Sequence, residues 1–223
     1  VAVSAKAPAR NIDDLQLNLS IMREIRLAID TARPRHVVNI GSDAVFCDGP
    51  LPLKEDSAKA PGSIHGLMHL ARELAFGGPD IPLVTIRPTL IYGPNDPHNG
   101  YGPNSFGRLA LKNANIILFG EGEERRDHVY VGDVAELIAR VILYDSIGSI
   151  NAATGSVWSF REIASMIVER AETTSRIESS ERKGEMPHGG LRTFDPTAVY
   201  QAFPDFTFTS LNEGVLHLVT GIE

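Results

Sequence analysis

Short apolar runs alternate with amphipathic stretches along the first half of the chain, and this alternation limits the possible fold more than any other feature. Runs typical of buried strands occupy His36–Ile40 and Pro82–Arg87, and helical periodicity precedes and separates them. Parallel strands need a long crossover connection, usually a helix, and that is what lies between these two runs. The order therefore predicts an α/β fold: a doubly wound parallel sheet with helices on both faces.

The two helices of this half have recognisable ends. Asp13 or Asp14 is suited to cap the first helix, and Pro34 would end it. The second helix is expected from about Ser63 to Phe76, just before two glycines. The inward face of the first helix would carry the apolar residues at helical spacing, namely Leu15, Leu19, Met22, Ile25 and Ile29.

The second half predicts a smaller part with short elements. From Pro88 the chain is dense in Gly and Pro before a helix of about Pro103–Lys112, which indicates a long functional loop. A short strand is expected at Ile116–Phe119, and Asp133 would cap the helix that follows. The inward residues of that helix would be Val134, Leu137, Ile138, Val141 and Ile142. Three more helices are expected, one over 160–168 and two short ones within 192–201 and 210–219.

The composition excludes several classes of function. The 223 residues are 43% hydrophobic, which is enough for a real core, and the net charge of −7 leaves no basic face for nucleic acid. Cys47 is the only cysteine, so no internal disulfide can form, and we expect a reducing, cytoplasmic location. No apolar run reaches the roughly 20 residues of a membrane helix, and the first residues do not resemble a signal peptide, so we expect no membrane partner.

Side chains with chemical potential gather between Ser42 and His69. The first strand ends just before Ser42, which places a hydroxyl at the carboxyl end of a parallel strand, where open α/β sheets bind ligands. The following helix presents His65 and His69 one turn apart on one face. Taken alone, Ser42 could equally be a hydroxyl that caps the turn after the strand.

Five stretches of the sequence resemble one known family in the same order. The family is the extended short-chain dehydrogenase/reductases, in particular the NAD-dependent epimerase/dehydratase group that works largely on nucleotide sugars. The matching stretches are LNLSIMREIRLAID, VVNIGSDAVF, IRPTLIYGP, GEGEERRDHVYVGDVAELIARVIL, and INAATGSVWSFREIA with LRTFDPTAVYQAFPDFTFTSLNEGVLHLV. The resemblance implies that residues 1–95 are the remainder of a Rossmann dinucleotide-binding domain. Residues 96–223 would be mainly substrate-binding, with about 116–150 returning to the Rossmann sheet.

The glycine-rich turn that opens this family does not occur in the sequence. Without a Gly-x-x-Gly-x-x-Gly pattern, the pyrophosphate site of NAD or NADP is absent from the chain as given. Val1–Ser4 is typical of the end of a buried strand, so we expect a truncated chain that begins inside the fold. The residue that selects NAD or NADP would lie in the same missing region.

The catalytic Tyr and Lys of the family fall on two histidines. In the family, the Tyr exchanges a proton with the sugar while hydride passes to or from the nicotinamide; a Ser or Thr holds the same oxygen, and the Lys favours the tyrosinate. Ser42 matches the hydroxyl residue, His65 the Tyr and His69 the Lys. With an ordinary pKa of about 6.5, His65 would be half-protonated near operating pH, whereas His69 would be mostly uncharged at neutral pH.

Several interpretations of the histidine pair stay open at this point. The pair could be a modified catalyst, the remnant of a site in a binding protein that lost the reaction, or half of a metal site. Gly66 follows His65 where metalloproteases carry a glutamate, so we expect no metal. The plainest alternative is two solvent-exposed histidines on a helix.

The resemblance also assigns residues that contact the cofactor. Ser4, Ala5 and Lys6 match the small-residue turn after the family's fourth strand. Asn18 matches an Asn of the following helix, and Pro88 begins the loop after the sixth strand.

Two further residues match positions that contact the diphosphate of a nucleotide sugar. These are Asn104 and Arg126, and a guanidinium suits phosphate through paired hydrogen bonds. Asn104 could instead cap the helix that follows it, and Arg126 could form a surface ion pair with Asp127.

The resemblance therefore implies an NAD(P)-dependent epimerase, dehydratase or keto reductase of a nucleotide-linked sugar, with His65 in place of Tyr. We expect a homodimer. A catalytically impaired dinucleotide- or sugar-binding member of the family is the alternative, and a scaffold that binds no ligand is a third class.

Overall fold

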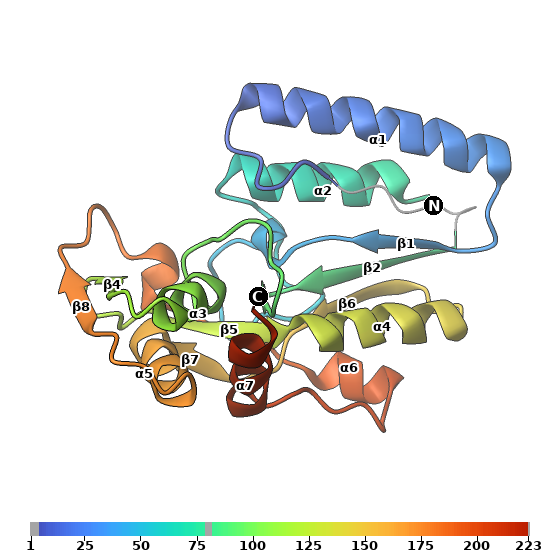
Figure 1. The fold of residues 1–223 in the computed structure, drawn as a ribbon. Helices are drawn as coiled ribbons and strands as arrows, with labels where there is room; N and C mark the ends of the chain where they lie inside the picture. Colours follow the sequence, from blue (N-terminus) through green and yellow to red (C-terminus); the bar gives the residue numbers. More distant parts are fainter. Residues whose placement is uncertain (1–4, 79–81, 223) are drawn as a thin grey trace. The chain divides into compact units, whose positions relative to one another are not determined.

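The computed structural model of the protein describes residues 5–78 and 82–222, which fall into two compact units (Figure 1). Unit 1 consists of the chain up to Pro88 together with Glu136–Ala152, and unit 2 consists of Thr89–Ala135 together with the chain from Ala153 onward. The strand expected at Val1–Ser4, and Ser4 with it, lies outside the described residues.

A parallel sheet forms the centre of unit 1. Its strands are β1 (Val37–Ile40), β2 (Leu83–Pro88) and β6 (Gly148–Ala152), in the order β1-β2-β6. Both pairings are parallel, so the carboxyl ends of the three strands share one edge. The buried faces of β2 explain why its sequence is nearly continuous in apolar residues. The parallel sheet predicted from the sequence is confirmed.

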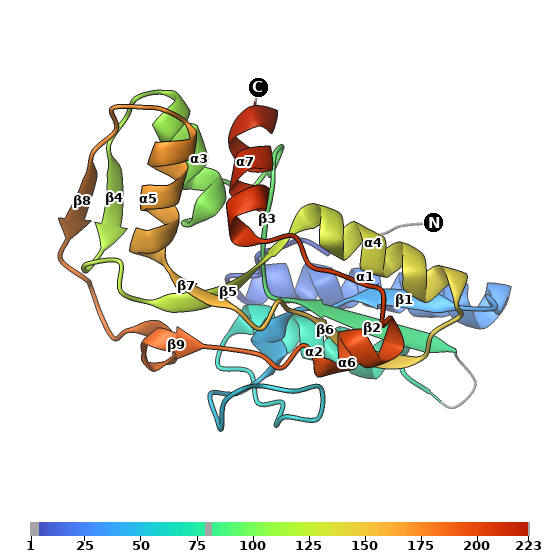
Figure 2. The same cartoon turned by 90° about the horizontal axis from the view of Figure 1, so that it is seen from below.

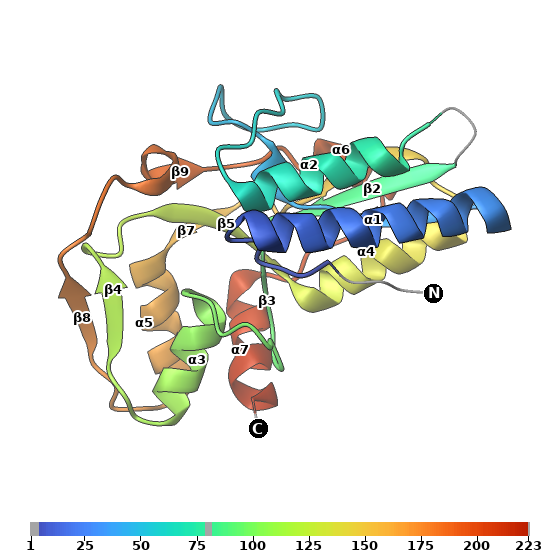
Figure 3. The same cartoon turned by 90° about the horizontal axis from the view of Figure 1, so that it is seen from above.

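Helices cover both faces of this sheet. The helices α1 (Ile12–Ala32) and α2 (Ile64–Phe76) run side by side over one face, as Figure 3 shows, and α4 (Val131–Leu143) runs along the other. A short 3₁₀ turn, η1 (Asp43–Val45), follows β1. The core between α1 and α2 is built from buried apolar side chains, among them Met22, Ile29, Met68 and Phe76.

Two details of α1 differ from the expectation. Its N-cap is Asn11, whose side chain accepts a hydrogen bond from the backbone N–H of Asp14, so neither Asp13 nor Asp14 is the cap. Leu19 is 47% exposed, because the buried stripe of the helix runs through polar Asn18 instead. Hydrophobic spacing alone could not identify a polar residue at the centre of the buried face.

Unit 2 contains two groups of strands (Figure 2). In the first group, β5 (Arg125–Tyr130) pairs in parallel with β3 (Leu90–Tyr92) and β9 (Leu191–Arg192) and antiparallel with β7 (Val157–Ser159). In the second, β4 (Ile116–Phe119) pairs in parallel with β8 (Ile177–Ser180). Strands far apart in the sequence thus meet at β5.

Three helices of unit 2 pack around one apolar core: α3 (Pro103–Leu111), α5 (Phe160–Arg170) and α7 (Leu211–Gly221). Unit 2 also contains α6 (Thr197–Ala202) and a 3₁₀ turn, η2 (Pro187–Gly190). Tyr92 belongs to that core and Tyr130 packs against it, and their rings meet edge-on with centroids 5.8 Å apart. Ser159 caps α5 through a capping box with Glu162.

The helix α4 also departs from its predicted cap. It begins at Val131, so Asp133 lies inside the first turn and cannot be the residue before the helix. Its carboxylate accepts hydrogen bonds from the backbone N–H and the hydroxyl of Thr209, at 2.9 and 2.6 Å. Ile142 is 52% exposed and does not point inward as predicted.

None of the helices described by the structure is long and apolar enough to cross a membrane.

Candidate active site

Ser42 lies just beyond β1, at the carboxyl end of the unit 1 sheet. Its hydroxyl oxygen accepts a hydrogen bond from the backbone N–H of Ala44 at 3.1 Å, which caps η1. The same hydroxyl donates to Asp43 Oδ1 at 3.4 Å. Ser42 therefore caps the turn after the strand, at the carboxyl end of β1.

The first turn of α2 is in backbone contact with η1. A Cβ atom placed on Gly66 would overlap the carbonyl oxygen of Ala44 and lie 2.7 Å from the Cβ of Pro61, so only glycine fits at this position. Ser63 caps α2, and its hydroxyl accepts a hydrogen bond from the Gly66 N–H at 3.1 Å. This contact fixes the register in which α2 presents His65 beside η1.

His65 and His69 pack against each other on one face of α2. Their ring centroids are 4.7 Å apart and the rings stand edge to face, at 88°. His65 is half-buried, His69 is only 7% exposed, and the Nδ1 atom of each is buried without a hydrogen-bond partner among the described residues. The interpretation of two solvent-exposed histidines is therefore wrong.

Burial sets the charge state of both rings. Desolvation lowers the pKa of His65, and the nearby carboxylate of Asp43 opposes this shift. Desolvation, then His65 and Arg72, lower the pKa of His69 to about 3. His69 is thus neutral at pH 7, as expected. The expected half-protonation of His65 is replaced by a largely neutral ring, which is the form that accepts a proton.

A buried ion pair joins β2 to α2. Arg87 on β2 donates from Nε and Nη2 to both carboxylate oxygens of Glu73 on α2, at 2.7 and 2.9 Å. Its Nη1 reaches the carbonyl oxygen of Glu55 at 3.3 Å, and Glu55 Oε1 accepts from the Asn151 N–H at 2.7 Å. This network ties the loop before α2 to the sheet. Sequence reasoning missed the pairing of Glu73 with Arg87.

The turn expected to face the cofactor is held by α1. Asn18 Oδ1 accepts a hydrogen bond from the Lys6 N–H at 3.0 Å, and its Nδ2 donates to the carbonyl oxygens of Lys6 and Asp14. Lys6 Nζ pairs with Asp14 at 2.8 Å. Asn18 therefore fixes the backbone of the turn that contains Ala5 and Lys6.

The alternative roles considered for Asn104 and Arg126 do not hold in unit 2. The N-cap of α3 is Gly102, and Asn104 Oδ1 accepts instead from the backbone N–H of Gly93 at 3.0 Å. Arg126 pairs with Glu124 at 3.1 Å, and its side chain is 13% exposed, so it forms no surface pair with Asp127. Neighbouring residues of a strand point to opposite faces, which separates Arg126 from Asp127.

A second arginine lies beside Arg126. In the parallel pairing of β5 and β9, Arg126 is the register partner of Arg192, which is 2% exposed and contacts His188 through Nη1 at 3.1 Å. Residues paired in register share a face of the sheet, so the two arginine side chains leave the sheet on the same face. Sequence reasoning missed Arg192, because nothing in the sequence shows that these two distant positions pair.

The sequence matches the model of the NAD dependent epimerase/dehydratase family over residues 1–153. The chain belongs to that family. This confirms the resemblance drawn from the five stretches.

Individual relatives of this family member are nucleotide-sugar enzymes. A UDP-glucose 4-epimerase of Mycolicibacterium smegmatis is 29% identical over 172 residues, which cover 71% of this chain and 55% of the relative. The fold matches that of a UDP-N-acetylglucosamine 4-epimerase from Methanobrevibacter ruminantium in complex with UDP-N-acetylmuramic acid, with a TM-score of 0.83 and 21% identity. That match covers 97% of this chain and 71% of the other.

A UDP-glucose 4-epimerase of Thermus thermophilus in complex with NAD gives a TM-score of 0.79 and 25% identity, over 98% of this chain and 73% of the other. These likenesses confirm the Rossmann-like α/β class. The chain spans just over half the length of the curated relatives it matches, at 55% and 60%.

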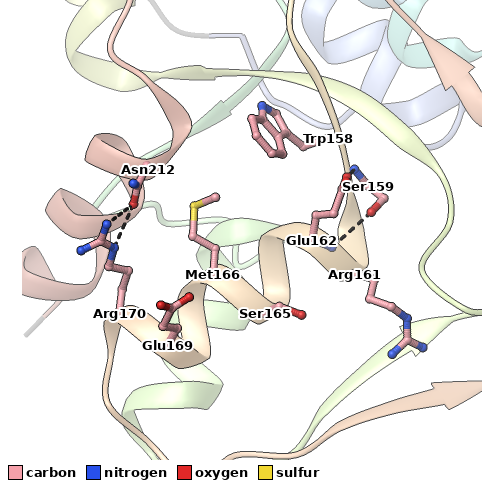
Figure 4. A pocket seen from close by; sticks show the side chains of 9 residues that line it. All are labelled: Trp158, Ser159, Arg161, Glu162, Ser165, Met166, Glu169, Arg170 and Asn212. Carbon is pink, nitrogen blue, oxygen red and sulfur yellow. Dashed lines mark hydrogen bonds between the residues drawn. The ribbon is translucent and has the colours of Figure 1, made fainter.

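Unit 2 of this epimerase/dehydratase family member also has an open cavity of about 470 Å³ along α5 (Figure 4). Its two guanidiniums already have protein acceptors: Arg170 donates to Asn212 at 2.8 and 2.5 Å, and Arg161 to Glu121 at 2.9 Å. None of the predicted site residues lines the cavity, so the cavity is separate from the residues expected to contact the diphosphate. The lining residues are Trp158, Ser159, Arg161, Glu162, Ser165, Met166, Glu169, Arg170 and Asn212.

Within 5–78 and 82–222, no cluster of three or more His, Cys, Asp or Glu side chains is arranged to hold a metal ion. His65 and His69 would supply only two ligands, and structural zinc sites need four. The described residues thus offer no metal centre around the histidine pair.

Proposed function

We propose that this protein is an NAD(P)-dependent epimerase, dehydratase or keto reductase of a nucleotide-linked sugar. One observation carries the proposal: a member of the epimerase/dehydratase family presents, at its sheet end, a hydroxyl on Ser42 and a half-buried, largely neutral imidazole on His65. The UDP-sugar relatives support the substrate class.

In this proposal His65 moves the proton and Ser42 orients the reacting oxygen. A neutral imidazole can accept the proton of a sugar hydroxyl, and general bases contribute typically about 10²- to 10⁴-fold to rate. The Ser42 hydroxyl would hold the same oxygen. His69 is neutral and buried against His65, and it supplies no positive charge. It therefore cannot favour an anionic neighbour as the family's Lys does.

The described residues fit the nicotinamide half of the cofactor. Buried Nδ1 atoms without partners on His65 and His69 offer hydrogen-bonding groups at the sheet end, and Asn18 fixes the turn of Ala5 and Lys6. The cofactor, when bound, accepts or returns hydride. Solved structures of similar fold carry NAD or NADPH, and both stay open for this chain.

For the substrate diphosphate we propose Arg126 together with Arg192, with Asn104 holding the nearby loop. Two guanidiniums in register offer paired donors to phosphate oxygens. Asn104 acts through the Gly93 backbone and need not contact the ligand. The division into residues 1–95 for the cofactor and 96–223 mainly for the substrate stays part of this proposal.

Turnover by the full-length protein tests the function directly. The protein is incubated with NAD or NADP and a panel of UDP- and dTDP-linked sugars, and products and cofactor reduction are followed. We expect activity with at least one sugar and a loss of at least about 100-fold in His65→Ala. The matched control is His36→Ala, a half-buried histidine of unit 1 that precedes β1 and so lies at the other end of this strand from Ser42. Activity that survives His65→Ala unchanged would refute the role of His65.

A binding protein that lost the reaction is the second candidate, and the neutral His69 favours it, because the site lacks the fixed cation of the family. This candidate predicts that NAD(H) or NADP(H) raises the thermal stability without any redox change on addition of sugars. Absence of any shift with either cofactor would argue against both candidates and for a scaffold.

We further propose a homodimer formed through α1 and α2. The outward side of α2 carries Leu67 and Leu74, two turns apart and 46% and 74% exposed, and α1 carries Leu19 and Leu27 at 47% and 48%. Apolar patches of this kind mark interaction surfaces, and a two-fold interface pairs the same patch on both copies. We keep the cytoplasm as the proposed location, because the single Cys47 fits a reducing compartment.

Sedimentation of the full chain tests this interface. Leu74→Asp should convert the dimer to monomer at micromolar concentration. Leu143→Asp is the control, since Leu143 lies at the end of α4 and is equally exposed, at 73%. A dimer that persists in Leu74→Asp would refute the proposed interface.

A further inference from the structure

The backbone contact at Gly66 brings one carboxylate close to His65. Because no side chain separates Gly66 from the Ala44 carbonyl, the first turn of α2 lies directly on η1. Asp43 belongs to η1, and His65 directly precedes Gly66. The contact that excludes every side chain at residue 66 therefore brings the element that carries His65 directly onto the element that carries Asp43.

Asp43 is a buried acidic side chain at the edge of the candidate active site. It is 7% exposed, and its Oδ1 accepts a hydrogen bond from the Ser42 hydroxyl at 3.4 Å. A buried carboxylate is expensive unless it has polar or charged neighbours, and His65 interacts with it electrostatically. Asp43 thus accepts a hydrogen bond from Ser42 and interacts electrostatically with His65 across the contact between η1 and α2.

The other ionisable groups facing α2 do not stabilise a charged His65. His69 is neutral, and Arg72 on the same face is a cation, which would disfavour a second positive charge. The remaining groups bind elsewhere: Arg26 of α1 donates to the carbonyls of Ala75 and Gly77, Asp14 of α1 pairs with Lys6, and Glu73 pairs with Arg87.

We propose that Asp43 is a positioning residue for proton transfer, whose carboxylate stabilises the positive charge that His65 gains when it takes a proton from the substrate. The proposal rests on the proposed function. In that step the O–H bond of the sugar breaks, its proton forms a new N–H bond on His65, and its electron pair forms the carbonyl bond. The hydrogen on the same carbon leaves with its electron pair as hydride to the nicotinamide. The imidazolium that results lies next to an anion.

This arrangement reverses the electrostatics that the family resemblance implies. A phenol that acts as a base becomes neutral on accepting a proton, so a neighbouring cation helps it by favouring the anion. An imidazole becomes positive on accepting a proton, so it needs a neighbouring anion instead. A cation at position 69 would oppose the positive charge that forms on His65. The neutral His69 does not, so it suits a base that is paired with Asp43.

Histidine NMR on the full-length protein tests the pairing without any need for activity. The ring resonances of His65, assigned with His65→Gln, are followed against pH in the wild type, in Asp43→Asn and in Asp56→Asn. Asp56 belongs to the loop before α2, so its variant loses the same charge from the same region. We expect the proton affinity of His65 to fall about three- to tenfold in Asp43→Asn and to change less than about twofold in Asp56→Asn.

A reciprocal measurement covers the case in which Asp43→Asn does not fold. In the wild type, the carboxyl carbon of Asp43 should show a step at the pH where the His65 ring titrates, and this step should vanish in His65→Gln. Equal His65 titration in the two aspartate variants, or no step at Asp43, would overturn the proposal.

The pH profile of turnover separates this inference from the proposed function. With an active sugar substrate, the acid limb of kcat/KM should move to lower pH in Asp43→Asn, because the free base binds its proton less tightly. An unmoved limb would overturn the positioning role. If no nucleotide sugar reacts while the NMR shift is present, the proposed function fails and the electrostatic pairing stands.

Discussion

The two units treat buried titratable side chains in different ways. In unit 1, half-buried His65 and buried His69 have Nδ1 atoms without a hydrogen-bond partner among the described residues, and packing holds the two rings in place. In unit 2, Arg126 and Arg192 are buried on hydrogen-bonded or ion-paired contacts along paired strands. Neutral side chains in the first group suit the proton transfer proposed for unit 1, and charged side chains in the second suit the anion binding proposed for unit 2.

The largest effect is expected where packing alone holds the site. Gly66→Ala would push a methyl group into the Ala44 carbonyl, and backbone cannot yield as a flexible side chain can. We expect a loss of about 3 kcal/mol in the free energy of unfolding. Urea denaturation measures it. Gly62→Ala, just before the helix, is the matched control, because nothing lies within 4 Å of its added Cβ. Equal stability of the two variants would show that the contact with η1 is loose.

Acid should destabilise unit 1 more than unit 2. Desolvation is the main cause that lowers the pKa of His69 in unit 1 and of His128 in unit 2, each to about 3. Each residue therefore contributes stability above about pH 6.5 that is lost as the pH falls toward 3. At about pH 5 the loss is about 2 kcal/mol for each residue. In unit 2, burial raises the pKa of Asp127 to about 6, and this group gains stability as pH falls through that value.

Hydrogen exchange, corrected for the intrinsic rate, measures this difference. Between about pH 7 and about pH 5, amides of α2 should lose more protection than amides of β5. His69→Gln should flatten the dependence in α2 and leave that of β5 unchanged. Equal loss of protection in α2 and β5 would contradict the expectation that acid destabilises unit 1 more than unit 2.

The same difference explains what the sequence could predict. The parallel sheet, α2 with its Ser63 start, and the pair His65 and His69 follow from local spacing, which helix and strand periods encode directly. Asn11 as a cap and Asn18 in the buried stripe are also local, but polar residues compete there with equally suitable neighbours.

Contacts between residues far apart in the sequence could not be predicted from it. The pairing of Arg87 with Glu73 depends on how a strand meets a helix, and the pairing of Arg126 with Arg192 depends on strand register. The lowered pKa of His65 also needs the structure, because burial sets it and the amino-acid type does not. The sequence could therefore predict which residues belong to the candidate site, but not their charge states or their interaction partners.

A smaller effect is expected for the paired arginines. Arg192→Lys keeps the charge and removes the planar fork, so it should weaken binding of UDP about tenfold, and Arg126→Lys should do the same. Isothermal titration measures the affinity. Arg35→Lys is the control, because Arg35 forms an exposed ion pair with Asp145 in unit 1. If only one of the two variants loses affinity, Arg126 and Arg192 do not bind the diphosphate together. The proposed anion binding would then not explain why both arginines lie on one face of the sheet in unit 2.

The smallest effect is expected for Asn104, which acts in unit 2 through a single backbone hydrogen bond. Asn104→Ala removes the acceptor of the Gly93 N–H and should lower stability by about 1 kcal/mol, in the range of a typical neutral hydrogen bond. Asn104→Asp keeps an acceptor oxygen and should retain the stability, while UDP affinity should fall if the side chain also faces the diphosphate. Loss of UDP affinity in Asn104→Ala well beyond about twofold would mean that Asn104 contacts the ligand itself. Charged and neutral donors would then both bind the anion in unit 2, in contrast to the packed, neutral site of unit 1.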